Sequence, residues 1–248
     1  MESIFQKTPV FPRICIGPAR AMYIGPGLDL VPHMNVATTI AVALADAFEL
    51  RFWKPRKQWS VWKSSVVSVI PSQSLHHLKS TGPMAFLYLD PLRDRCLSLK
   101  DQTLVQGREK IFGVSQEISI NAAFDAFGLL PNRPKDSRIS RVLSEIERSP
   151  NAFGRIQDAA SLASLSPSRF RARFDAEVGL PFRRYRLWRR MAMVMRNISA
   201  GVSLTDAALA AGFSSSAHLS TAFKTMFGLS PSDVLSLGVT IDVSEDKV

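Results

Sequence analysis

Arginine is the residue type in this chain whose number and placement point most directly to chemistry. Between positions 133 and 234 the sequence carries 16 Lys and Arg residues against 8 Asp and Glu, and 14 of the 16 cations are Arg. Eight of them fall between Arg169 and Arg190. The guanidinium group offers a planar fork of donors that pairs with phosphate or with the edge of guanine. The pattern indicates a surface for nucleic acid, although a solvated face or an acidic protein partner also explains a basic excess.

Residues that could support catalysis or bind a metal are too sparse to indicate either. Cys15 and Cys96 lie far apart and outside any CxxC pair, which argues against a disulfide framework or a zinc ribbon and favours a reducing cytosol. No Ser/His/Asp arrangement, P-loop or glycine-rich dinucleotide motif occurs at a meaningful spacing. We therefore expect a protein that is not an enzyme and that holds no cofactor and no metal.

Length and hydropathy predict a soluble protein of one large domain or two ordinary ones. The chain has 248 residues, of which 46% are hydrophobic and 21% charged, as in folded globular proteins. No apolar run reaches the roughly 18 residues that cross a bilayer, and the N-terminus carries no export signal. We expect a cytoplasmic protein that has access to the chromosome and has no membrane partner.

The first half of the sequence contains the short β-branched and alternating runs that are typical of strands. Candidate strands cover residues 38–44, 48–52, 59–62, 66–70 and 84–89. Short strands at this spacing favour a small sandwich or barrel. Residues 115–127 have a helical pattern instead, and the prolines at 131 and 134 indicate a hinge. We place a β-rich domain at residues 1–131.

The second half has helical periodicity from Asp136 onward. One apolar stripe consists of Ile139, Val142, Leu143 and Ile146. Further helices are expected at 156–163, 167–178, 182–198, 204–211 and 215–227. Ser203 and Ser214 stand at positions for N-caps, and Pro167 suits a first helical turn. Glycines stand where helices should end, at positions 179, 201 and 228. The fold class is therefore α+β with two domains, of which the helical one spans residues 135–237.

Within the helical half, one segment occurs twice. Asp158, Ala159 and Ala160 recur 48 positions later as Asp206, Ala207 and Ala208. After the turn the offset is 49, and the matching residues are Phe170 and Leu219, Phe174 and Phe223, Gly179 and Gly228, and Leu180 and Leu229. Each copy combines a short alanine-rich helix, a tight turn and a second helix with apolar residues at i and i+4. This is the pattern of a helix-turn-helix, whose second helix enters the major groove.

These segments resemble the AraC/XylS transcription regulators. Residues 207–231 are similar to the second helix-turn-helix signature of that family, and residues 165–170 with Phe174 and Gly179 to the first. Residues 182–185 and Arg190 resemble the start of the linker helix between them. The resemblance implies a sequence-specific regulator that reads two successive major-groove segments of double-stranded promoter DNA, with RNA polymerase as a partner. A helix over 182–198 is about 25 Å long, which suits reading heads roughly one DNA turn apart.

The resemblance and a helical wheel give the candidate DNA contacts. On the first recognition helix, the family positions that face base edges map onto Ser168, Arg171 and Ala172, and the wheel adds Arg169. On the second, the matching positions are Ser216, Ala217, Ser220 and Thr221, whereas Leu219, Phe223 and Phe227 are expected to face inward. Because the side chains of the second set are small, we expect that unit to act through phosphate contact, thymine methyl groups or DNA shape.

The resemblance also implies an N-terminal cupin-like β-barrel with short helices, which binds a small-molecule effector or drives homodimerisation. Residues 71–76 are similar to the second barrel motif, and Pro32-His33 lies near the first. The candidate effector-binding residues are His33, Trp53, His76 and Tyr88, with Trp59, Trp62 and Phe86 as further aromatic candidates. Aromatic residues at strand spacing more often form plain core. Since His76 and His77 are adjacent, at most one of them can face a barrel interior, and no His-x-His cluster indicates a metal.

The sequence leaves rival functions open. A protein-interaction module, such as an anti-activator that docks on another regulator, would suit the small residues of the second recognition helix. A cupin oxygenase or isomerase would need a triad of metal ligands that the sequence lacks. Lys224 and the arginines between 183 and 190 are either phosphate contacts or a solvated face, and His218 is either structural or a phosphate contact.

Overall fold

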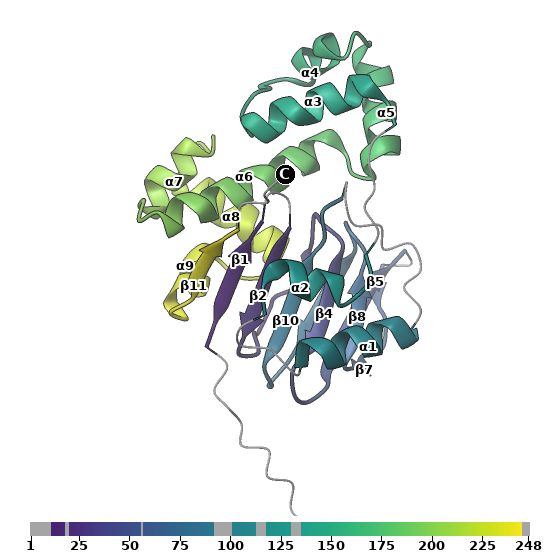
Figure 1. Cartoon of the computed structure of the whole chain (residues 1–248), viewed down its shortest axis with the longest axis vertical. Coiled ribbons are helices and arrows are strands. Elements are labelled where there is room, and N and C mark those ends of the chain that lie inside the picture. The colour runs from purple at the N-terminus through teal and green to yellow at the C-terminus, as the bar shows by residue number, and fades with distance from the viewer. Residues whose placement is uncertain are drawn as a thin grey trace, which may run out of the picture.

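The protein consists of a β-rich half and a helical half, which are stacked on one another (Figure 1). The computed structural model describes residues 11–17, 20–55, 57–91, 101–112, 118–129 and 135–244. The α+β class and the order of the two halves along the chain agree with the sequence prediction. None of the helices in the described part has the length and apolarity that a bilayer crossing requires. The predicted hinge at 131–134 lies outside the described residues.

A six-stranded sheet forms the centre of the β-rich half. Its strands follow the order β11, β1, β2, β10, β4 and β8. They span Thr240–Val243, Arg13–Ile16, Ala21–Gly25, Met84–Tyr88, Thr39–Ala43 and Val67–Ile70. Neighbouring strands are antiparallel except β11 and β1, which run parallel with Arg13 opposite Thr240. The last strand in the described residues, β11, therefore returns to the sheet of the first half.

Both faces of this sheet are buried, which explains its uninterrupted apolar runs. Ile40 and Val42 of β4 pack with residues of α1 (Asp101–Phe112) and α2 (Ile120–Asp125), which cover one face. Ala41 and Ala43 belong to the other face and join the core that is shared with the helical half. A strand that is buried on both sides is expected to have a continuous apolar sequence.

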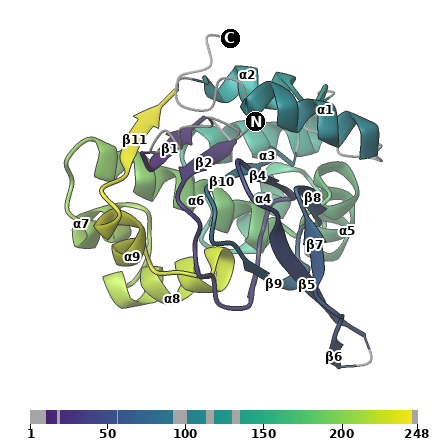
Figure 2. The ribbon, with the colours of Figure 1, turned by 90° about the horizontal axis from the view of Figure 1, so that it is seen from below.

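A second sheet contains β3 (His33–Met34), β9 (Leu75–Lys79), β5 (Phe48–Lys54) and β6 (Gln58–Trp59), and β7 (Lys63–Ser65) also pairs with β5. The hairpin of β5 and β6 projects from the body of the molecule (Figure 2). The hydrogen bonds of the described strands form two sheets, not a closed barrel.

The strand predictions succeed for the long apolar runs and miss most of the rest. β4, β5, β8 and β10 coincide with predicted strands. Of the strand predicted at 59–62, only Trp59 lies in a strand, β6, and the patterns do not predict β1, β2, β11 or α1. Of the helix predicted at 115–127, the described residues contain only α2.

The helical half contains seven described helices, α3 to α9. They span Ser137–Arg148, Ile156–Leu162, Pro167–Val178, Phe182–Ser199, Leu204–Ala210, Ser216–Phe227 and Pro231–Ser236. Ser203 caps α7 as predicted, because its side chain accepts a hydrogen bond from the backbone of Asp206. The prediction of Ser214 as the cap of α8 is wrong, since Ser215 accepts from the backbone N–H of His218.

The end of α8 forms a backbone junction with the β-rich half. Gly228 adopts a left-handed conformation with φ of 82°, and its carbonyl accepts a hydrogen bond from the N–H of Val31 at 3.0 Å. A Cβ atom at Gly228 would lie 2.7 Å from Nδ1 of His33 and 2.9 Å from the carbonyl oxygen of Val31. Gly179 is the repeat equivalent at the end of α5, where φ is 76° and a Cβ atom would meet nothing within 4 Å. Only the second glycine is enclosed by the β-rich half.

This pair of glycines gives a matched test of the junction. We expect Gly179→Ala to lower the free energy of unfolding by about 1–2 kcal/mol, which is the cost of a left-handed alanine. Gly228→Ala should cost roughly 1–3 kcal/mol more, because its methyl group also overpacks the junction. Urea unfolding of the full-length variants measures both values. Equal losses would mean that α8 and β3 are not in contact in solution.

Candidate nucleic-acid interface

The two repeats fold into helix-turn-helix units with the same internal geometry. α4 and α5 form the first unit, and α7 and α8 form the second. The small residues that allow close helix approach are all buried, namely Ala159, Ala160, Ala163, Ala207, Ala208 and Ala211. Each turn contains one left-handed residue, Ser164 with φ of 53° in the first and Gly212 with φ of 78° in the second. The backbone N–H that follows, of Leu165 or Phe213, donates to Ala160 or Ala208 at 2.9 Å in both units.

The first recognition helix, α5, presents a polar and basic face to solvent. Phe170, Phe174 and Val178 are buried beneath it. The four predicted contacts on this helix, Ser168, Arg169, Arg171 and Ala172, are all exposed. Ser166 caps the helix and Pro167 occupies its first turn, so the exposed face begins directly at the turn of the motif.

The second recognition helix, α8, presents smaller side chains. Ala217 and Thr221 are exposed, whereas Ser216 and Ser220 are half-buried. The hydroxyl group of Thr221 donates to the carbonyl of Ala217 at 3.1 Å, which leaves it less free to select a base. Leu219 and Phe223 face inward as predicted, but Met226 is more deeply buried than Phe227.

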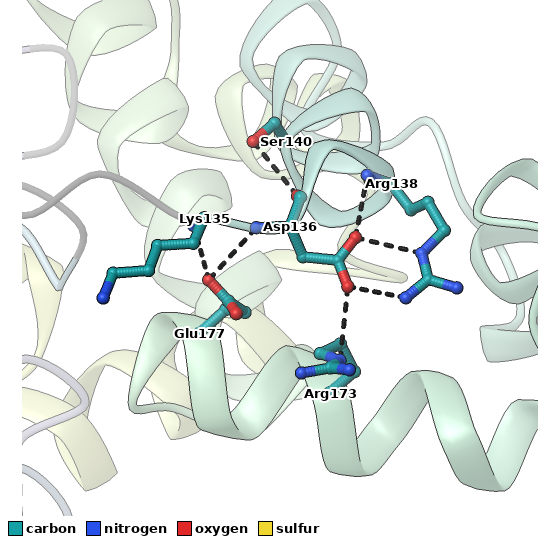
Figure 3. Close-up of polar contacts among 6 residues, drawn as sticks. All are labelled: Lys135, Asp136, Arg138, Ser140, Arg173 and Glu177. Atoms are coloured by element: carbon teal, nitrogen blue, oxygen red, sulfur yellow. Dashed lines mark hydrogen bonds and ion pairs between the residues drawn. The ribbon is translucent and has the colours of Figure 1, made fainter.

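A charged cluster fixes α5 against the start of α3 (Figure 3). The carboxylate of Asp136 caps α3, pairs with Arg138 at 2.8 Å and reaches Arg173 of α5 at 3.2 Å. Glu177 of α5 accepts from the backbone N–H groups of Lys135, at 2.7 Å, and Asp136. The hydrogen bond from Arg138, with the charge of Arg173, lowers the pKa of Asp136 to about 2. Arg173 therefore holds the recognition helix in place, a role that the sequence pattern does not indicate.

A single helix, α6, connects the two units. Its 18 residues correspond to a length of about 27 Å, close to the spacing expected from the sequence. α5 and α8 lie toward its opposite ends (Figure 1). The ring of Phe182 packs 5.2 Å from that of Phe170 and 5.3 Å from that of Phe174, so the start of α6 is held in the core of the first unit.

The histidines that were candidates for effector binding form a buried pair. The rings of His33 and His76 lie 4.2 Å apart, edge to face, and both side chains are almost fully buried. Burial and the neighbouring His76 lower the pKa of His33 to about 3, and burial also lowers the pKa of His76. His77 is only partly buried, as the alternation of a strand requires. Within the described residues, no group of three His, Cys, Asp or Glu side chains could hold a metal ion.

The aromatic candidates separate into two groups. Trp53 is 41% exposed and contacts Trp59, whose ring lies 5.3 Å away in the β5–β6 hairpin. Tyr88 instead contacts two rings of the helical half, Trp188 at 5.9 Å and Phe227 at 5.3 Å. The structure therefore does not gather His33, Trp53, His76 and Tyr88 into one pocket.

Tyr88 lines an apolar cavity between the two halves of the protein. The cavity has a volume of about 70 Å³. Phe86 and Tyr88 of β10 face Trp188 and Met191 of α6 and Phe227 of α8 across it. Burial raises the pKa of Tyr23 and of Tyr88, and the hydroxyl group of Tyr23 donates to the carbonyl of Pro26. Sequence reasoning named Phe86 and Tyr88 as candidates but missed the helical wall of the cavity, because that wall comes from a distant part of the chain.

Comparison with known proteins finds the same helix-turn-helix units and a similar overall fold. Residues 159–236 match the family model described as "Helix-turn-helix domain". The fold is similar to that of an apo lysine-to-alanine variant of ToxT from Vibrio cholerae strain SCE256, with a TM-score of 0.56 and 11% sequence identity. The match covers 88% of this chain and 97% of the ToxT chain. A second similar structure is ToxT from Vibrio cholerae O395 bound to (E)-4-(8-methylnaphthalen-1-yl)but-3-enoic acid. The TM-score is 0.53 and the sequence identity 12%, and the match covers 91% of this chain and 98% of that one. A third is ToxT from Vibrio cholerae strain SCE256 with an unsaturated fatty acid bound, with a TM-score of 0.51 and 12% identity. That match covers 92% of this chain and 93% of the other.

Two helix-turn-helix units that expose their second helices from one rigid linker define a DNA-binding transcription regulator. Residues 159–236 form a helix-turn-helix domain, and the two-domain fold is similar to that of ToxT over most of the chain.

The charge of Asp136 can be removed without removing the helix cap, because Asn caps helices as well as Asp does. The pKa of this carboxyl is about 2 in the folded protein and about 3.9 when unfolded. Its ion pairs therefore stabilise the fold fully above about pH 4, and this contribution is lost as the pH falls toward 2. We expect Asp136→Asn to unfold at a lower urea concentration than the unsubstituted protein at pH 7, with a gap that narrows below pH 4.

Asp125→Asn is the matched control, because it removes the same charge from an exposed position on α2. Its urea midpoint at pH 7 should equal that of the unsubstituted protein. A gap for Asp136→Asn that stays constant with pH would contradict the assigned role of the carboxylate.

Proposed function

We propose that this regulator reads two adjacent major-groove segments of promoter DNA in a sequence-specific way. The observation that carries the proposal is the exposure of two recognition faces at opposite ends of α6. The first face comprises Ser168, Arg169, Arg171 and Ala172. The second comprises Ser216, Ala217, Ser220 and Thr221. The other parts of both helices are anchored by buried aromatic and aliphatic side chains.

The two faces support different kinds of recognition. Arg169 and Arg171 can pair bidentately with guanine, and such a pair supplies about 1–3 kcal/mol of discrimination. Ala217 and the back-bonded Thr221 offer apolar contact with thymine methyl groups and little else. We therefore assign the strict base preference to the first half-segment and a preference for DNA shape to the second.

Selection from a random duplex library with the purified full-length chain tests this proposal. We expect an enriched motif of two half-segments about one helical turn apart. Enrichment of no sequence, with retained tight binding to another regulator, would instead support the anti-activator function that the small residues of α8 suggest.

Arg171→Ala should weaken binding to the enriched motif by roughly 5- to 150-fold, because about 1–3 kcal/mol of base discrimination is lost. The preference at one position of the first half-segment should relax, while the second half-segment stays unchanged. Arg148→Ala serves as the control, since Arg148 is an exposed arginine at the far end of α3 that pairs with Glu145. Repeating the selection with both variants gives the readout.

We further propose that a neutral apolar effector enters the cavity between the two halves. One ToxT structure holds an unsaturated fatty acid, whereas no Lys, Arg or His occurs among the described residues that line the cavity here. A volume of about 70 Å³ is far below the roughly 300 Å³ of a usual ligand pocket. A ligand of ordinary size therefore has to separate α6 and α8 from the sheet, and this movement reaches the second recognition helix.

The absence of a cation from the described lining predicts the chemistry of the ligand. The methyl ester of an unsaturated fatty acid should raise the melting temperature of the protein more than the free acid does, because no cation in the described lining offsets the cost of burying the carboxylate. Ala192→Phe, which places a ring in the cavity, should abolish both shifts. A strong preference for the free acid would show that a cation takes part in binding.

The remaining roles are proposed together. Residues 1–131 act as the sensing or dimerisation domain and residues 135–237 as the DNA-binding domain. The protein works in the cytoplasm at the nucleoid, contacts RNA polymerase, forms a homodimer and has no catalytic activity. The regulator class and the two-domain fold support these assignments.

A further inference from the structure

A cleft lined with arginine lies between the two helix-turn-helix units. Its volume is about 800 Å³. The basic side chains that line it come from both recognition helices and from α6, namely Arg171, Arg183, Arg184, Arg186, Arg190 and His218. Arg183, Arg186 and Arg190 are spaced i, i+3 and i+7, so they follow one face of α6. One flank of each recognition helix thus borders the same basic surface.

The positive charge of this cleft is not balanced from within. No Asp or Glu occurs among the described residues that line it. The negative charge of Asp158 attracts the Arg186 guanidinium, but the Asp158 carboxylate already accepts a hydrogen bond from the backbone N–H of Arg155. Burial and the charge of Arg183 lower the pKa of Arg186, and burial with the charge of Arg186 lowers that of Arg190. An anion in the cleft would relieve this repulsion.

Two of the guanidinium groups are held in place by contacts with the protein and still have N–H donors without a hydrogen-bond partner. Arg190 lies 4.0 Å from the ring centre of Phe213, and its Nε donates to the carbonyl of Ala211 at 2.6 Å. Its Nη2 is buried and has no hydrogen-bond partner. Arg186 lies over the ring of Phe182, and its Nε is likewise buried without a partner. Buried donors are normally paired in a folded protein, and an anion in the cleft would supply the partner that these two lack.

We propose that this cleft binds the DNA backbone phosphates that lie between the two major-groove segments. The inference rests on the proposed function, because two segments read from one face of a duplex bring the intervening phosphates opposite α6. Guanidinium forks pair well with phosphate oxygens. Arg186 and Arg190 are then the phosphate-binding residues, and they fix the register of the two reading heads.

The β-rich half also reaches this cleft. Gln73, in the turn between β8 and β9, lines it with an exposed side chain. Its backbone is left-handed, with φ of 60°, and its N–H donates to the carbonyl of Asn35 at 2.8 Å. The sensing half thereby contributes a wall, and an amide donor, to the phosphate site.

The salt dependence of binding to the enriched duplex tests the proposal. Between about 50 and 200 mM salt, each lost phosphate contact should reduce the slope of log K against log salt by about 0.9. Arg186→Gln and Arg190→Gln should each show this reduction and weaker binding, with no change in the selected sequence. Lys110→Gln, which removes one charge from an exposed position on α1, should keep the original slope. Urea unfolding checks that each variant is folded, and Arg183→Gln at the exposed edge of the cleft provides a second variant.

Phosphate ethylation interference locates the contacts on the duplex. Interference at phosphates between the half-segments, lost in the Arg186→Gln variant, is the expected result. The proposal would be overturned if folded Arg186→Gln and Arg190→Gln both kept the slope of log K against log salt of the unsubstituted protein. Interference only at phosphates that do not lie between the half-segments would overturn it as well. So would a melting shift with free pyrophosphate that depends on Arg186 while the DNA slope does not change, because the cleft would then hold a small anion. If the unsubstituted protein enriches no sequence, the proposed function fails instead.

Discussion

The burial of the apolar face of α6 is the interaction on which the rest of the structure depends. Phe182 and Tyr185 lie in the core of the first helix-turn-helix unit, while Trp188 and Met191 pack toward the β-rich half. One continuous helix is therefore shared by both helix-turn-helix units and by the β-rich half. Because a helix is stiff over about 27 Å, the positions of α5 and α8 relative to one another follow from how this single element is packed.

The second recognition helix links DNA binding to the other half of the protein. Thr221 faces solvent, whereas Phe223 and Phe227 of the same helix line the cavity beneath the sheet. The carbonyl of Gly228 at its end is bound by Val31 of the β-rich half. A ligand that widens the cavity has to move this helix, since packed interiors do not deform continuously. Under the proposed function, such a ligand acts on the second recognition helix directly, without a separate relay.

The strand β11 adds a second physical connection between the halves. It follows the helical domain in sequence but completes the edge of the N-terminal sheet, where Asp242 pairs with Arg13. The chain is thus attached to the β-rich half both before and after the helix-turn-helix units. An assignment of two consecutive domains describes the order of the sequence but leaves out this return.

The sequence by itself determined the elements whose stabilising contacts are local. The limits of α5 follow from Ser166, Pro167 and Gly179, and the repeated alanines define both helix-turn-helix units, because caps and i, i+4 contacts join residues within one or two turns. The exposed face of α5 followed from the same periodicity. Only the tertiary structure decided the partner of β11, the ion pair of Asp136 with Arg173, the apolar cavity and the arginine cleft. Each of these joins residues that are distant in sequence, and no local period records which distant residue a side chain will meet.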